Sequence, residues 1–81
     1  MSEELLNLIE SLMQIEEDSG VPKNVRLKIQ NAISALKQEE IELSIKANKA
    51  LQELDDISDD PNIPPYVRPQ IWNIVSLLAG I

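Results

Sequence analysis

The sequence predicts an all-α protein, a four-helix bundle made of two repeated helical hairpins. Apolar residues recur at intervals of three and four in four segments, which is the spacing of one helix face. Runs with proline, joined by Gly20 in the first half, separate the segments within each half, and the second half repeats the first at an offset of 42 residues. The 81 residues leave room for one helical domain over 1–81.

The first hairpin is predicted from two amphipathic segments. One helix should cover about residues 2–17, with Ser2 as its cap and acidic residues next to the positive end of its dipole. Gly20 and Pro22 end it and begin a second helix over about 22–37. The inward stripes are Leu5, Leu8, Ile9, Leu12 and Ile15, then Val25, Ile29, Ala32, Ile33 and Leu36.

The second hairpin follows the same plan. A third helix is expected over about 39–57, and the run 59–65 is a strong breaker. The last helix should reach Ala79, with an irregular or 3₁₀ first turn because Pro69 lacks a donor. The inward stripes are Leu43, Ala47, Ala50, Leu51 and Leu54, then Val67, Ile71, Ile74, Val75 and Leu78.

The boundary between the second and third helices is weakly marked. Residues 36–41 contain neither glycine nor proline, and the neighbouring apolar residues are nearly heptadic, so one continuous helix over 22–57 in a dimer is an alternative. Glu39 and Glu40 interrupt the stripe where a turn would fall. Two separate helices are therefore the favoured prediction.

The internal repeat aligns residues 5–36 with 47–78 without a gap, giving ten identities where chance gives about two or three. Asp18 with Arg26, and Asp60 with Arg68, are predicted to meet near the two turns and tie each hairpin. The pattern of Asp, Pro and Val-Arg resembles a HEAT-type repeat. Two units fall short of the three that a solenoid needs, so a closed bundle is expected.

A second resemblance covers nearly the whole chain. The run Leu54–Pro64, followed by Val67-Arg68, Ile71-Trp72 and residues 75–78, is similar to the archaeal group called uncharacterised protein family 0147. The resemblance implies an all-α four-helix fold and an archaeal cytoplasmic setting. It implies no activity, cofactor or site residue.

Composition limits the possible functions. Seven basic and fourteen acidic residues give a net charge of −7, which disfavours direct binding to nucleic acid or to anionic membranes. Cysteine and histidine are both missing, so no catalytic site and no cofactor or metal centre is expected. An acidic start and the lack of a long apolar run favour a cytoplasmic location without a membrane anchor.

Two surfaces are candidates for a role. The first is an acidic cap near the two turns, interpreted mainly as a solvated end, with a basic partner as the alternative and a weak divalent ion as a third reading. An EF-hand register starting at Asp56 fails, because Pro61 and Val67 occupy its glycine and glutamate positions. The cap comprises Glu16, Glu17, Asp18, Asp55, Asp56, Asp59 and Asp60.

The second candidate is the last helix. Gln30, Ala32 and Ala35 of the first repeat are replaced by Trp72, Ile74 and Leu77 in the second. Only three residues from 71 to 81 are not apolar, which is more apolar coverage than one buried face requires. The excess is either core or a partner interface, with Tyr66, Trp72, Leu77 and Ile81 as the interface candidates.

The leading functional hypothesis is a non-enzymatic helical interaction module that binds a protein partner or a second copy of itself. The alternatives are a bundle that binds a small ligand between its helices and protein-mediated association with a ribonucleoprotein complex.

Overall fold

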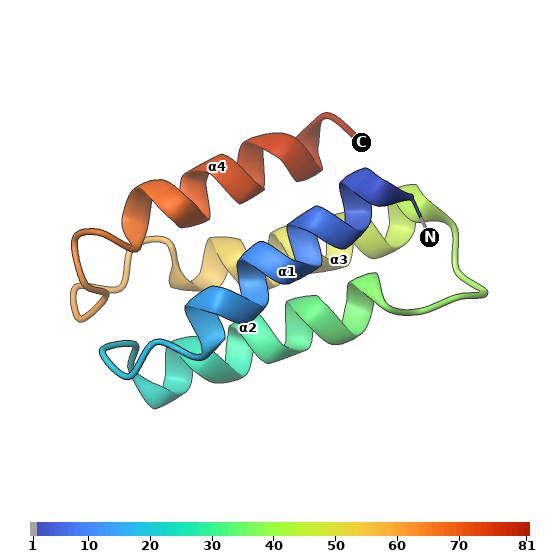
Figure 1. The fold of residues 1–81 in the computed structure, drawn as a ribbon. Helices are drawn as coiled ribbons and strands as arrows, with labels where there is room; N and C mark the ends of the chain where they lie inside the picture. Colours follow the sequence, from blue (N-terminus) through green and yellow to red (C-terminus); the bar gives the residue numbers. More distant parts are fainter. Residues whose placement is uncertain (1) are drawn as a thin grey trace.

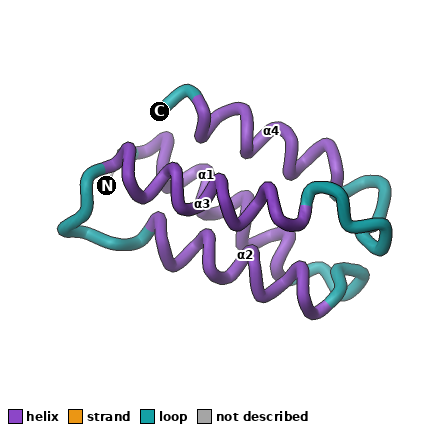
Figure 2. Tube along the Cα trace, turned by 180° about the vertical axis from the view of Figure 1, so that it is seen from behind, coloured by secondary structure: helices purple, strands orange, loops and turns teal. Residues whose placement is uncertain are grey.

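The computed structural model describes residues 2–81 and has four antiparallel helices in a closed bundle (Figure 1). The helices are α1 (Glu3–Glu16), α2 (Lys23–Leu36), α3 (Leu43–Ile57) and α4 (Arg68–Ala79). Each helix packs on the next, and α4 returns to α1, while the Cα atoms of the diagonal pairs all lie more than 8 Å apart. Seen from behind, the turns 17–22 and 58–67 lie at one end, and both termini lie with the α2–α3 loop at the other (Figure 2). The predicted fold class is confirmed.

The helix boundaries agree with the sequence pattern except at the middle of the chain. Ser2 caps α1, its Oγ accepting a hydrogen bond of 3.1 Å from the Leu5 N–H. Residues 37–42 form a loop, so the continuous helix is wrong, and α3 begins at Leu43 rather than near residue 39. The loop lets α3 reverse direction and bury its apolar face on α2, and this packing overrides the helix propensity of the loop residues.

A tight turn precedes α4, whereas the first turn of the helix itself is α-helical, with the Ile71 N–H donating to the Val67 carbonyl at 3.0 Å, so the predicted irregular or 3₁₀ turn lies just outside the helix. The Val67 N–H donates to the Pro64 carbonyl at 2.9 Å, an i to i−3 bond that forms a tight turn before the helix. Pro69 then lies in the first turn of α4, where its missing N–H leaves no helix bond unmade.

The core is aliphatic throughout residues 2–81. Its buried side chains are Leu, Ile, Val and Ala, and no polar side chain is buried among them. The predicted stripes build this core, apart from half-buried Leu51 and Val75 and from Leu43, which is 40% exposed at the first residue of α3. Pairs of repeat equivalents such as Leu12 and Leu54 are fully buried, so both repeats supply the core in the same way.

Candidate functional site

Each turn is held by an arginine that binds backbone oxygens. Arg26 Nε donates to the Glu16 carbonyl at 3.0 Å, and its Nη2 donates to the Asp18 carbonyl at 3.1 Å. In the second repeat, Arg68 donates to the carbonyls of Ser58 at 3.0 Å and Asp60 at 2.7 Å. Each arginine thus meets the aspartate of its own turn, through the main-chain carbonyl of that residue and not through its carboxylate. The guanidinium instead satisfies carbonyls at the helix end, which have no partner within the helix.

The aspartate carboxylates form the turns themselves. Asp18 Oδ1 accepts the Gly20 N–H at 2.8 Å, and Asp60 Oδ1 accepts the Asn62 N–H at 2.8 Å, so each closes a local Asx turn. The bond from Asn62, followed by the bond from Asn24 and the nearby Arg68 charge, lowers the pKa of Asp60 below its ordinary value. In both repeats, an aspartate at the equivalent position thus closes the turn through its carboxylate.

Each carboxylate also accepts a hydrogen bond from the other repeat. Tyr66 Oη donates to Asp18 Oδ1 at 3.0 Å, and Asn24 Nδ2 donates to Asp60 Oδ2 at 2.9 Å. Residues 24 and 66 are repeat equivalents. Each hairpin therefore donates one hydrogen bond to the other hairpin and accepts the equivalent bond from it. Such reciprocity is the mark of an isologous contact, whereas solenoid repeats stack head to tail. The HEAT resemblance therefore stays a resemblance of sequence pattern.

The contact between α2 and α3, here called the closed seam, is the tightest in the bundle. Lys28 Nζ lies 3.0 Å from Asp56 Oδ2 and 3.5 Å from Glu53 Oε2, and Asn31 Nδ2 donates to the same Glu53 oxygen at 3.5 Å. The hydrogen bond to Asp56 and the charges of both carboxylates raise the pKa of Lys28. The apolar side of this seam is lined by small residues, namely Ala32, Ala35, Ala47 and Ala50.

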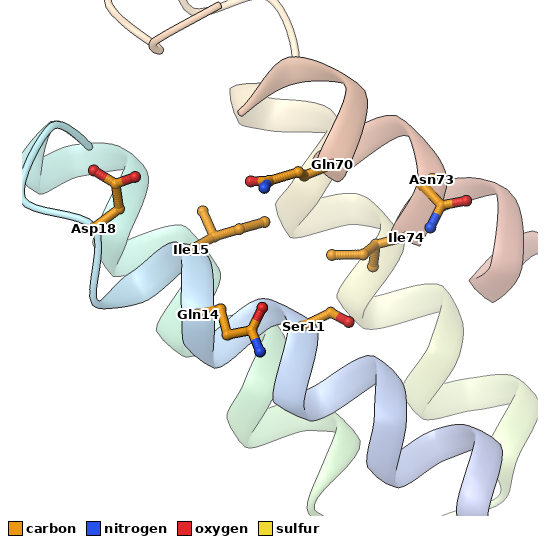
Figure 3. Close-up of a pocket in the computed structure, with 7 residues that line it drawn as sticks. All are labelled: Ser11, Gln14, Ile15, Asp18, Gln70, Asn73 and Ile74. Atoms are coloured by element: carbon orange, nitrogen blue, oxygen red, sulfur yellow. The ribbon is translucent and has the colours of Figure 1, made fainter. Parts of the chain in front are cut away.

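The contact between α1 and α4, here called the open seam, is the loosest. A cleft of about 170 Å³ lies along it, with the side chains of the two helices on either side (Figure 3). Ile15 and Ile74 lie at its base, where they are buried, only 3% and 2% exposed. Its polar lining consists of Ser11, Gln14, Asp18, Gln70 and Asn73.

The apolar excess of α4 is exposed rather than buried. Trp72 is 61% exposed and Tyr66 57%, and Leu77 and Ile81 are 43% and 37% exposed. Trp72 and Leu77 are five residues apart, which places them about 140° apart around an α-helix. Leu77 shares the side of α4 that carries Gln70, toward the open seam, whereas Trp72 lies on the other flank. Trp72 and Leu77 of the predicted interface thus lie on two flanks of α4, while Tyr66 precedes the helix and Ile81 follows it.

The predicted acidic cap lies at the end of the bundle that holds both turns, as its placement beside residues 17–22 and 58–67 requires. Three of its carboxylates are engaged within the chain, those of Asp18, Asp56 and Asp60. No group of three or more acidic side chains among residues 2–81 is arranged to hold a metal ion. Lys28 opposes the acids, a role missed from sequence because it depends on the alignment of α2 with α3.

Fold and site together define a small acidic all-α protein built by duplication of one helical hairpin. The chain belongs to the uncharacterised protein family UPF0147, whose model matches residues 1–81.

Known proteins agree with this assignment. A UPF0147 protein of Pyrococcus furiosus is 37% identical over 81 residues, covering 98% of this chain and 87% of the relative. A UPF0147 protein of Aeropyrum pernix is 36% identical over 70 residues, covering 86% of this chain and 77% of the relative. The crystal structure of MMP1188, a protein of unknown function, superposes with a TM-score of 0.92 at 48% identity, covering 98% of this chain and 90% of that one.

No helix among residues 2–81 has both the length and the apolar character needed to cross a lipid bilayer.

Proposed function

We propose that this protein is a non-enzymatic interaction module that binds another protein chain through α4. The observation that carries the proposal is Trp72, 61% exposed on a helix whose one charged residue is Arg68. The first repeat has Gln30 at the equivalent position, so the framework of the hairpin does not need an indole there. An exposed tryptophan on an uncharged helix surface is a common anchor of protein interfaces.

The energetics support this assignment. An indole is among the largest apolar surfaces that a side chain can offer, and covering about 100 Å² of it contributes roughly 2–3 kcal/mol. A partner that covered Trp72 would gain this free energy without removing a charge from water, because the exposed side chains of α4 after Arg68 are neutral. The partner is a cytoplasmic protein in this proposal, either an unrelated chain or a second copy.

The test compares two substitutions that remove one exposed apolar side chain each. Trp72→Gln installs the residue of the first repeat, and Leu27→Gln is the matched control on α2, where the leucine is 51% exposed. Tagged forms are purified from the organism of origin for mass spectrometry, and each is measured by light scattering at several concentrations. Wild type and Leu27→Gln should retain a partner or a dimer that Trp72→Gln loses. A strict monomer that retrieves no partner, or equal retention by all three proteins, would contradict the proposal.

A second candidate is a contact between the acidic cap and a basic protein, such as a protein component of a ribonucleoprotein complex. It is favoured by Glu16, Glu17, Asp55 and Asp59, whose carboxylates make no ion pair within residues 2–81. Binding at this end should weaken strongly between low and high salt, whereas binding through Trp72 should not. Retrieval of partners at both salt concentrations separates the two candidates.

The third candidate, a small-ligand bundle, has weaker support. The cleft in the open seam measures about 170 Å³, below the roughly 300 Å³ at which ligand pockets begin.

A further inference from the structure

The apolar stripes of α2 and α3 keep one register across the loop that separates them. Positions spaced alternately by four and three residues run from α2 through residues 37–42 into α3, which is a heptad pattern. Eight of the nine positions are apolar, and they are Ile29, Ile33, Leu36, Glu40, Leu43, Ala47, Ala50, Leu54 and Ile57. Two helices joined by a closed loop do not need a shared register. One continuous helix does need it, to keep its apolar side chains on one side.

The loop has few features of a fixed turn. Residues 37–42 contain neither glycine nor proline, and they project beyond the helices at one end of the bundle (Figure 1). The cap residue of α3, Glu42, makes no side-chain hydrogen bond to the start of the helix, and Leu43 is 40% exposed. The packing of α3 on α2 therefore keeps a helix-favouring segment in a loop. That packing would be the same if α3 came from a second copy of the chain.

The pairing of α2 with α3 is the pairing that two extended helices would have. Three polar contacts between the two halves join residues whose numbers add up to 84. They are Lys28 with Asp56, Asn31 with Glu53, and Lys46 with the carbonyl of Gln38. A constant value indicates one antiparallel register, whose midpoint falls at Glu42, at the end of the loop. Two helices that crossed at Glu42 would keep all three contacts, now between chains.

We propose that two copies of this chain exchange hairpins. In the exchanged dimer residues 23–57 form one helix in each chain, and α1 and α2 of one copy pack on α3 and α4 of the other. The bonds from Tyr66 to Asp18 and from Asn24 to Asp60 join the two hairpins, so they form again between the chains. The contacts that close the monomer thus select a second copy as the partner. This inference does not rest on Trp72, which stays exposed in both forms.

The charges of the loop favour the closed monomer. Glu39, Glu40 and Glu42 of each chain lie near the crossing point of the exchanged dimer, opposed by Lys37 and Lys46. Like charges at short range oppose association, and Glu40 would also place a charge on the apolar stripe. Exchange separates the two hairpins and their shared core, so it requires unfolding and is slow. Protein that has never been unfolded therefore stays closed during a binding measurement.

The test refolds an equal mixture of isotope-labelled and unlabelled protein from urea at high and at low protein concentration. Size-exclusion chromatography with light scattering measures the ratio of dimer to monomer after dilution. A carbodiimide then joins Lys28 to Asp56, whose charged atoms lie 3.0 Å apart, and mass spectrometry shows whether the linked peptides come from one chain or two. The full chain is used with and without Trp72→Gln, which removes the anchor of the proposed function.

Two loop variants make the test sharper. Glu40→Leu completes the apolar stripe and removes one carboxylate from the crossing point, so it should raise the ratio of dimer to monomer at least tenfold. Gln38→Leu adds the same side chain to the same loop on the side of the continuous helix away from the stripe. It should leave the ratio unchanged. Both positions are exposed in the monomer, so neither variant disturbs the core.

The expected result is a dimer that forms on refolding at high concentration, persists on dilution and contains links between labelled and unlabelled chains. Trp72→Gln should give the same result. Only monomer from both wild type and Glu40→Leu, links confined to single chains, or an equal effect of Gln38→Leu would overturn the inference. A dimer with unmixed links that Trp72→Gln abolishes would support the proposed function and overturn hairpin exchange.

Discussion

At the scale of single residues, an arginine and an aspartate stabilise each copy of the duplicated turn in different ways. The arginine donates to carbonyls at the end of one helix, and the aspartate accepts the N–H two residues ahead and a side chain from the other hairpin. The sequence predicted that these residues meet, because the repeat retains them at the same spacing. It could not predict which atoms pair, since a guanidinium and a carboxylate each have several acceptable partners at a helix end.

Replacing Arg68 by Met should lower the free energy of unfolding by about 1–3 kcal/mol, because two half-buried carbonyls lose charged donors. Arg26→Met should lower it by a similar amount, since its bonds are repeat-equivalent. Urea denaturation measures both, with Lys23→Met as an exposed control. An unfolding free energy of Arg68→Met within error of wild type would contradict the assigned role.

The lowered pKa of Asp60 predicts a dependence on acid pH. The Asp60 carboxyl group holds its proton less tightly in the folded protein than in the unfolded protein. In the unfolded protein its pKa is near 3.8. The stabilisation is therefore present above that pH and is lost as the pH falls through the lowered folded value. Asp60→Asn should reduce the loss of stability between pH 5 and about pH 2 relative to wild type.

Urea denaturation at successive pH values measures this effect. The control is Asp59→Asn, an exposed neighbour whose side chain accepts no hydrogen bond from residues 2–81. A steeper acid dependence in Asp60→Asn than in wild type would refute the linkage.

At the scale of helices and seams, apolar periodicity was sufficient to locate four helices and most of the core. The start of α3 was missed because residues 37–42 favour a helix and only the packing of α3 on α2 forces a loop. The cleft was not predicted either, because it depends on how α1 is aligned with α4. One signal was nonetheless present: the repeat alignment pairs Lys28 with Gln70 and Asp56 with Gln14.

The difference between the seams predicts opposite tolerance to size changes. Ala50 is fully buried in the closed seam, so Ala50→Leu should overpack it and cost about 1–3 kcal/mol. Leu77 is 43% exposed at the open seam, so Leu77→Ala should change stability by at most about 0.5 kcal/mol. Chemical denaturation measures the change in unfolding free energy for both variants. Equal changes at the two positions would show that the two seams do not differ in packing.

At the scale of the whole molecule, acidic residues are unevenly distributed, and α4 carries none of them. Helix α4 carries Arg68 and no acid, so six basic and fourteen acidic residues elsewhere give the rest of the chain a charge of −8. The acids lie on α1, on α3 and in the segments that connect the helices, and α4 presents exposed apolar side chains. Where the repeats agree they build the frame, and where they differ, at Trp72, the second repeat exposes the side chain assigned to binding.

Trp72 is the single tryptophan of the chain, so its fluorescence reports on the proposed interface directly. Free protein at low concentration should emit at the long wavelength of a water-exposed indole, in keeping with its exposed fraction of 61%. Emission should move to shorter wavelength when the retrieved partner is added or, for a homodimer, as concentration rises, because binding removes water from the ring. A complex that forms, as measured by light scattering, with no change in Trp72 emission would contradict the central claim.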